Sequence, residues 1–219
     1  MNNEIERVHK IEPDTVGIQS DFIAFERVDR FAANDETIKL PNRKTAASAG
    51  YDFYAAEDTI IPPWADGYED FNDAVLEEIQ SNPDVYKNID DVNNKFNPIT
   101  LDSLAALTKK YKFKPTLVPT GIRCFIPKCC YLQLSVRSSL PLKHWLILAN
   151  GVGIIDADYY RNPDNDGEIY FQLINLSPFP IVIKKGECFG QGVILPYVTT
   201  GNDNVDTERT GGFGSTDAK

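Results

Sequence analysis

Residues 129–139 read CCYLQLSVRSS, and this stretch decides the fold class because apolar and polar side chains alternate along it. Such alternation is typical of a β-strand that buries one face. Similar short runs follow and precede it, each bounded by Pro, Gly, Asn or Asp. They are TLVPTGIRCFIP (116–127), HWLILAN (144–150), EIYFQLIN (168–175), FPIVIKK (179–185) and CFGQGVILPYV (188–198). Short strands separated by turns predict an all-β sandwich or closed barrel.

The strand pattern is also present nearer the N-terminus, and it sets the domain boundaries. The runs there are FIAFERV (22–28), TIKL (37–40), YDFYAA (51–56) and TIIPP (59–63). We therefore predict one β domain formed by residues 21–64 and 115–198. Residues 1–20 form a polar N-terminal extension, and the Gly-, Asn- and Asp-rich residues 199–219 form a C-terminal arm that we expect to be mobile.

Residues 65–114 interrupt the strand pattern with helical signals. Apolar side chains recur at helical spacing over 70–80 and again over 101–111, where Thr100 is a candidate N-cap. We predict a small helical insertion that packs its apolar stripes and lies outside the catalytic machinery. The insertion is rich in acidic residues. It is therefore either a docking surface for an unknown protein partner or a tolerated surface insertion.

Composition excludes several classes of protein. The net charge of −10 argues against nonspecific nucleic-acid binding, which depends on a basic surface. No apolar run approaches the ~20 residues needed to span a bilayer, and the N-terminus lacks a signal-peptide core, so we expect a cytoplasmic protein with no membrane partner. The four cysteines contain no CxxC pair, which favours reduced thiols packed in strands over a zinc site.

Three segments carry groups suited to phosphate chemistry, although each has an ordinary structural interpretation. Asp156 and Asp158 follow a strand run, so they form either a solvated turn or a hairpin tip that presents a general base. The sequence Arg137-Ser138-Ser139 offers a forked cation and two hydroxyls that suit a phosphate, or it is an exposed strand end. The glycine-rich tail around Phe213 is either disordered or a hinge that carries an aromatic cover.

Taken together, five segments in this order resemble the five motifs of the trimeric dUTP diphosphatase (dUTPase) family. They are AGYDFYAAEDTIIPP (49–63), VRSSLPLKH (136–144), NGVGIIDADYY (150–160), GECFGQGVILPY (186–197) and RTGGFGST (209–216). The resemblance covers residues 22–63 and 116–216. It implies an all-β, dUTPase-like β jelly-roll (β-clip) subunit, here with a small helical insertion. It also implies a homotrimer whose active sites each borrow motifs from all three chains.

The resemblance implies hydrolysis of dUTP to dUMP and pyrophosphate, which limits uracil in DNA and supplies dUMP for thymidylate synthesis. By position, Asp156 is implied to activate the water that attacks the α-phosphorus. Tyr159 is implied to pack under the deoxyribose and to leave no room for a 2′-hydroxyl. Residues implied to read the uracil edge are Asn150 and, through their backbone groups, Gly153, Ile154, Ile155 and Tyr170.

The remaining implied roles concern the phosphates and the metal. Asp52 is implied to orient waters on a Mg²⁺ ion that bridges the phosphates. Residues implied to hold the phosphate chain are Arg137, Ser138, Ser139 and Gln191. The arm is implied to close over the γ-phosphate with Phe213 stacked on the uracil. Its contacts come from Arg209, Gly214, Ser215 and Thr216.

The sequence departs from the family pattern in three places, and two alternatives stay open. Thr210 alone separates Arg209 from the paired glycines, residues 160–166 lengthen the hairpin, and the insertion replaces a short turn. One alternative is a relative of the dCTP deaminases, which share the fold but use a glutamate where this chain has Gln172. The other is a dUTPase-like protein with a regulatory, protein-binding role, either in place of hydrolysis or, through the insertion, beside it.

Overall fold

The computed structural model describes residues 23–64 and 114–205, together with positions 66, 73, 77, 80, 81, 207, 209, 211 and 212. Short β-strands joined by turns make up this part of the chain. The strands are β1 (Ala24–Arg27), β2 (Tyr51–Tyr54), β3 (Thr59–Ile61), β4 (Thr116–Pro119), β5 (Ile122–Phe125), β6 (Cys130–Val136), β7 (Leu146–Leu148), β8 (Gly153–Ile155), β9 (Tyr170–Asn175), β10 (Ile181–Ile183) and β11 (Cys188–Pro196). A helix, α3 (Ser139–His144), follows β6, and a 3-10 turn, η4 (Ala157–Tyr159), follows β8.

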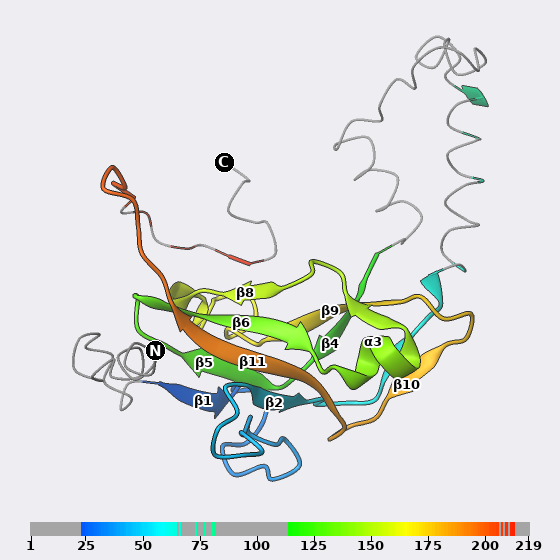
Figure 1. Ribbon diagram of the computed structural model, residues 1–219, viewed down its shortest axis with the longest axis horizontal. Coiled ribbons are helices and arrows are strands. Elements are labelled where there is room, and N and C mark those ends of the chain that lie inside the picture. The colour runs from blue at the N-terminus through cyan, green and yellow to red at the C-terminus, as the bar shows by residue number, and fades with distance from the viewer. Residues whose placement is uncertain are drawn as a thin grey trace, which may run out of the picture.

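The strands pair in antiparallel fashion into small sheets. The largest sheet has the order β2-β11-β6-β8, and a second has the order β4-β9-β7. Two-stranded sheets form from β1 with β5 and from β10 with β3. In Figure 1, β11 and β6 run side by side in front, with β4 and β9 behind them. The prediction of an all-β fold is therefore confirmed.

Aromatic side chains join the two larger sheets. The ring of Phe171 on β9 lies 5.6 Å from that of Phe53 on β2 and 5.0 Å from that of Phe189 on β11. All three side chains are almost completely buried. Burial of one such side chain contributes roughly 1.5–3 kcal/mol to stability. This core holds β6 and β8 in place, and those two strands carry the candidate site.

The alternation predicted along β6 is present in the structure. Leu132 and Leu134 are buried, whereas Tyr131 and Gln133, which alternate with them, are half-buried. Buried Leu132 and Leu134 pair in register with Ile155 and Gly153 of β8. The local sequence pattern was sufficient to predict which side chains of β6 are buried, because successive side chains of any strand point to opposite faces of the sheet.

Two sequence-based expectations about local structure are wrong. Residues 37–40 form no strand: Thr37 lies in a turn and the following residues are irregular, because the Asp35 carboxylate accepts hydrogen bonds from both the backbone N–H and the hydroxyl of Thr37. Ser139 and His144, which we expected to belong to the two strand runs on either side of residues 140–143, are part of α3. Pro141 is tolerated in the first turn of that helix, where a backbone N–H is not needed, and Leu140 is buried.

A buried arginine ties the N-terminal strand to the rest of the domain. Arg123 on β5 donates to Glu26 at 3.0 Å and to Asp29 at 2.9 Å, and it also pairs with Asp166. Its side chain is 5% exposed. Burial lowers the pKa of Arg123, but the three carboxylates raise it by more, so the guanidinium stays charged. These contacts of Arg123 connect β1, β5 and the loop that follows η4.

Candidate active site

A cavity of about 190 Å³ lies beside β8 and collects most of the residues expected to handle the nucleoside. We call it the hairpin cavity. The expected site residues that line it are Asn150, Gly153, Ile154, Ile155, Asp156, Tyr159, Tyr170 and Arg209. The structure therefore brings the candidate base, the candidate uracil and sugar contacts, and one residue of the C-terminal arm together.

Asp156 occupies the N-cap position of η4. Its backbone is extended (φ −80°, ψ 160°), and its side chain makes no capping hydrogen bond. The side chain is 50% exposed. The carboxylate is thus not committed to the backbone of its own turn, as it would be in a purely structural turn. It lines the hairpin cavity, where its partner is Arg209 and not its own backbone.

Arg209 of the arm contacts both carboxylates at this turn. Its Nε donates to Asp158 Oδ1 at 2.7 Å, and its Nη2 donates to Asp156 Oδ2. Partial burial lowers the pKa of Arg209, but the hydrogen bonds and charges of the two aspartates raise it. A permanent cation therefore lies against the candidate base. The expectation that Arg209 closes over a γ-phosphate stays a prediction.

Tyr159 forms a rigid wall of the cavity. Its side chain is 6% exposed, and its hydroxyl donates to the backbone carbonyl of Glu168 at 3.2 Å. The same hydroxyl accepts a hydrogen bond from Asn165 Nδ2 at 2.6 Å. Burial raises the pKa of Tyr159, which keeps the phenol protonated for its donor role. Because the ring is buried and two hydrogen bonds hold its hydroxyl, its face is suited to support a flat or puckered ring of a ligand.

The groups expected to hold phosphates form a separate set, which we call the phosphate cluster: Asp52, Arg137, Ser138, Ser139 and Gln191. Asp52 on β2 pairs in register with Gln191 on β11. Gln191 Nε2 donates to Ser135 Oγ at 3.1 Å, and Arg137 Nε lies 3.8 Å from Asp52 Oδ1. Adjacent strands therefore place these side chains at one end of the large sheet.

The start of α3 adds the hydroxyls of the cluster. Ser138 is the N-cap residue of α3, and its side chain makes no capping hydrogen bond. A second cavity, of about 410 Å³, is lined by Arg137, Ser139 and Cys188 among others. Burial, followed by the negative charge of Asp52, raises the pKa of the Cys188 thiol to about 11. The phosphate cluster thus combines one arginine with two serine hydroxyls, and a protonated thiol lies beside it.

Within one chain, the hairpin cavity and the phosphate cluster lie far apart. Leu132 of β6 pairs with Ile155, so Asp156 lies beside Tyr131, and both line one small surface pocket. Arg137 lies six residues farther along β6, or about 20 Å away at ~3.3 Å per residue. This separation exceeds the reach of hydrogen bonds from either side chain. The expected site residues are therefore not all brought together in a single subunit.

Asp52 is the residue best suited to hold the expected Mg²⁺ through water. Its side chain is almost buried, and its Oδ2 has no hydrogen-bond partner. A buried carboxylate oxygen without a hydrogen-bond partner fits a cation that keeps several waters and takes its other ligands from substrate phosphates. Within the described ranges, no group of three or more His, Cys, Asp or Glu residues could form an all-protein metal site.

Several expectations concern residues outside the described part of the chain. Those of the fifth motif are Phe213, Gly214, Ser215 and Thr216. Nearly all of the insertion at 65–114 and the whole extension at 1–20 also lie outside it, so the proposed helices and the protein-docking role stay predictions. None of the helices in the described residues is long and apolar enough to cross a membrane.

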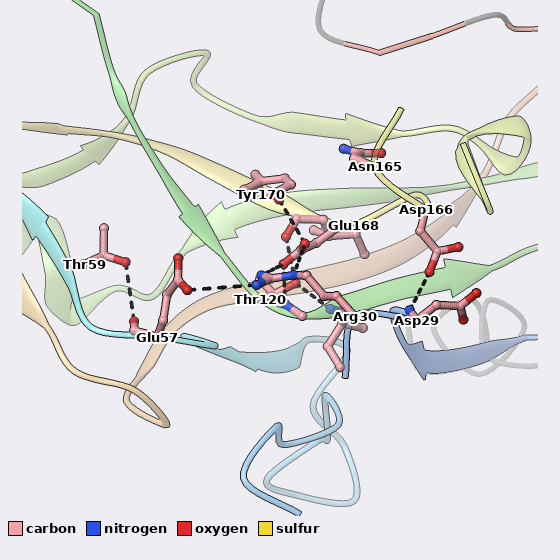
Figure 2. A network of polar contacts seen from close by, with 12 residues as sticks. Asp29, Arg30, Glu57, Thr59, Thr120, Asn165, Asp166, Glu168 and Tyr170 are labelled. Atoms are coloured by element: carbon pink, nitrogen blue, oxygen red, sulfur yellow. Dashed lines mark hydrogen bonds and ion pairs between the residues drawn. The ribbon is translucent and has the colours of Figure 1, made fainter. Parts of the chain in front are cut away.

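Sequence reasoning missed a second set of polar residues around the cavity. Glu168 is 2% exposed and accepts two hydrogen bonds from Arg30, while Asn165 holds Tyr159. Figure 2 shows Arg30 reaching Glu168 beside Tyr170. No local pattern marks these residues, since Arg30 and Glu168 are separated by 138 positions.

Known proteins resemble this chain over the region that carries the hairpin cavity and all of the phosphate cluster except Asp52. The sequence profile of the family described as dUTPase matches residues 101–217, more than half of the chain. The deoxyuridine 5′-triphosphate nucleotidohydrolase of Lactococcus lactis is 47% identical over 104 residues, which cover 47% of this chain and 69% of that protein. The enzyme of the same name from Hydrogenobaculum sp. is 40% identical over 112 residues, which cover 49% of this chain and 74% of that protein.

Solved structures agree with the sequence matches. The crystal structure of dUTPase from Streptococcus mutans has a TM-score of 0.55 and 30% identity, covering 81% of this chain and 98% of that one. A mutant dUTPase from phage phi11 of S. aureus, described with a structural Mg(II) ion, has a TM-score of 0.50 and 15% identity. That match covers 84% of this chain and 97% of that one, and it supports the fold alone. From the family profile and the relatives together, this chain belongs to the dUTPase family.

Proposed function

We propose that this chain hydrolyses dUTP to dUMP and pyrophosphate with Asp156 as the general base. The observation that carries the proposal is the position of the Asp156 carboxylate in the lining of the hairpin cavity, where Arg209 holds it and its own turn does not. Around it, Asn150 and Tyr170 are available to contact the base, and Tyr159 provides a rigid ring surface. These residues lie inside the segment that matches the family profile.

The reaction begins when a water molecule loses a proton to the Asp156 carboxylate and attacks the α-phosphorus. A bond forms between the water oxygen and that phosphorus. The bond from the phosphorus to the oxygen bridging it to the β-phosphate breaks, and pyrophosphate leaves with the electron pair. Arg209 has to leave Asp156 before the carboxylate can accept the proton. The triphosphate supplies the negative charge that competes for its guanidinium.

We further propose that the complete site forms between copies of the chain. A water on the α-phosphorus must lie within hydrogen-bond reach of Asp156 while the phosphates contact Arg137. The separation of about 20 Å between those positions along β6 prevents this within one subunit. A neighbouring subunit that places its phosphate cluster against the hairpin cavity resolves the conflict. A closed homotrimer repeats that contact three times.

Mg²⁺ would be held by the substrate phosphates and by waters that Asp52 orients. When bound, it would neutralise phosphate charge and fix the conformation of the triphosphate. The support from this chain is the buried, unpartnered Oδ2 of Asp52. Arg137 and Gln191, which flank Asp52, would contact the remaining phosphate oxygens.

Pyrophosphate release from dUTP tests the function directly. We expect turnover with dUTP, much slower turnover with UTP because Tyr159 leaves no space for a ribose hydroxyl, and no ammonia from dCTP. Ammonia release without pyrophosphate would instead favour the deaminase alternative. Another residue would then have to replace the glutamate of the deaminases, because this chain has Gln172 at that position. Binding of dUTP without either product would favour a regulatory protein.

A further inference from the structure

Glu168 is a buried carboxylate whose hydrogen-bonding capacity is filled by three other segments of the chain. Arg30 donates to Oε2 from its Nε at 2.9 Å and to Oε1 from its Nη2 at 2.6 Å. The backbone N–H of Gly121 donates to Oε1 at 2.9 Å, and the hydroxyl of Tyr170 donates to Oε2 at 2.9 Å. Figure 2 shows Arg30 and Tyr170 meeting at this carboxylate.

The residue before Arg30 makes a parallel connection. The backbone N–H of Asp29 donates to Asp166 Oδ2 at 2.7 Å, and Arg123 pairs with the same carboxylate. Asp29 and Arg30 are therefore attached to the two ends of one short segment, Asp166 to Glu168, as Figure 2 also shows. That segment closes the long loop after η4 and leads directly into β9. We call these two connections the turn clamp.

The turn clamp reaches the hairpin cavity through two tyrosines. The Glu168 carboxylate holds the hydroxyl of Tyr170, and the Glu168 carbonyl holds the hydroxyl of Tyr159. Both rings line the cavity. Burial and the adjacent charge of Glu168 raise the pKa of Tyr170 to about 12, so its hydroxyl remains a donor at neutral pH. One residue thus sets the position of two walls of the cavity.

Removal of one partner of such a pair is costly because a buried carboxylate needs compensating donors. Without Arg30, the Glu168 carboxylate would lose two of its four donors and would turn toward other groups or water. The hydroxyl of Tyr170 would then lose its fixed acceptor. The candidate base would be unaffected directly, since Asp156 contacts Arg209 and not the clamp.

We propose that Glu168 and Arg30 are positioning residues that fix Tyr159 and Tyr170 for the nucleoside. Affinity for the nucleoside therefore depends on the N-terminal turn at Asp29 and Arg30, which touches no part of the substrate. This inference rests on the proposed function, because it assigns the hairpin cavity to the nucleoside of dUTP. It predicts that clamp variants raise KM and leave kcat nearly unchanged.

Four variants test the clamp in the full-length protein. We expect Glu168→Gln and Arg30→Met each to raise the KM for dUTP about tenfold with kcat within about twofold. Tyr170→Phe removes only the hydroxyl and should raise KM about threefold. Arg30→Lys keeps the charge and one donor, so it should recover part of the loss seen with Arg30→Met. The Kd for dUMP, measured by calorimetry, should rise in parallel with KM.

Asp58→Asn is the matched control. It breaks an exposed ion pair with Lys184 at 2.8 Å, far from the cavity residues, and should change neither KM nor Kd. If Glu168→Gln does not fold, Arg30→Met still tests the proposal, because Arg30 is 43% exposed and its loss leaves the core packed. Folded Arg30→Met and Tyr170→Phe proteins with wild-type KM and Kd would overturn the clamp. A wild type that releases no pyrophosphate but binds dUMP, with a Kd that the clamp variants raise, would overturn the proposed function alone. A wild type that does not bind dUMP would overturn both.

Discussion

The hairpin cavity and the phosphate cluster differ in how far one chain completes them. In the hairpin cavity, Tyr159 is held by Asn165 and by the carbonyl of Glu168, and Tyr170 is held by the carboxylate of Glu168. In the phosphate cluster, Asp52 has an unpartnered oxygen, and its contact with Arg137 is a long one of 3.8 Å. The walls of the hairpin cavity are therefore preformed, whereas the phosphate cluster keeps an unpartnered carboxylate oxygen and a loosely held arginine.

This difference has a physical reason. Recognition of a nucleoside depends on shape, so its walls gain from being rigid before the ligand arrives. Phosphates bring several negative charges, and a cluster that satisfied its own arginine with internal carboxylates would have no donors left for them. The free oxygen of Asp52 and the loosely held Arg137 fit the proposed site, which substrate, Mg²⁺ and a second subunit would complete. The following predictions test this comparison, from the largest expected effect to the smallest.

Replacement of the candidate base should have the largest effect. Asp156→Asn keeps the shape of the side chain but cannot accept the proton, so kcat for pyrophosphate release should fall by ~10²–10⁴-fold while dUTP binding is largely retained. Asp158→Asn is the control, because it also loses a carboxylate that pairs with Arg209 but does not remove the base. Its kcat should stay within several-fold of wild type. Near-normal turnover by Asp156→Asn would refute the assignment.

Mixing two inactive proteins tests whether the cavity and the cluster cooperate across subunits. Asp156→Asn and Arg137→Ala should each be nearly inactive alone. After the two are co-refolded at equal amounts, roughly a quarter of the sites should combine an intact Asp156 with an intact Arg137 from another chain. Pyrophosphate release should recover to that level. Each variant refolded by itself is the control, and no recovery in the mixture would place both clusters in one chain.

Alanine substitutions at two glycines separate the cost of backbone strain from the cost of a steric clash. Gly151 and Gly167 have φ values of +71° and +72°, but only at Gly167 would a Cβ meet backbone, 2.5 Å from the carbonyl oxygen of Tyr159. Gly151→Ala should lower the free energy of unfolding by about 1–2 kcal/mol through backbone strain. Gly167→Ala should cost roughly 1–3 kcal/mol more, because the backbone must shift. Urea unfolding at one fixed protein concentration measures both, and equal losses would show that the loop is loosely packed.

The smallest effect concerns the thiol beside the phosphate cluster. Cys188 has a pKa raised to about 11 by burial and then by the charge of Asp52. Asp52→Asn removes a negative charge that opposes the thiolate, so the pKa should fall and alkylation of Cys188 at mildly alkaline pH should become about threefold faster. Exposed Cys129 provides the internal reference in peptide mass spectrometry. Unchanged labelling of Cys188 relative to Cys129 would show that Asp52 does not act on it.

Much of the fold could be predicted because its signals are local. The alternation along β6 appears in the structure as buried Leu132 and Leu134. The two incorrect predictions of local structure also have local causes. At 37–40 the side chain of Asp35 formed a turn that a strand pattern does not reveal. At α3, Ser139 and His144 belonged to strand runs of the sequence, although they bound a helix that accepts Pro141 in its first turn.

By itself, the sequence determined which chemical groups the chain carries and in what order: a carboxylate after a strand, an arginine with two serines, and a glycine-rich arm. The tertiary structure decided which of them meet. Strand register separates Asp156 from Arg137, although both lie next to β6. Folding brings Arg30 to Glu168 across 138 positions. Distances of this kind depend on sheet pairing and core packing, which are set by the whole chain, so no short segment encodes them.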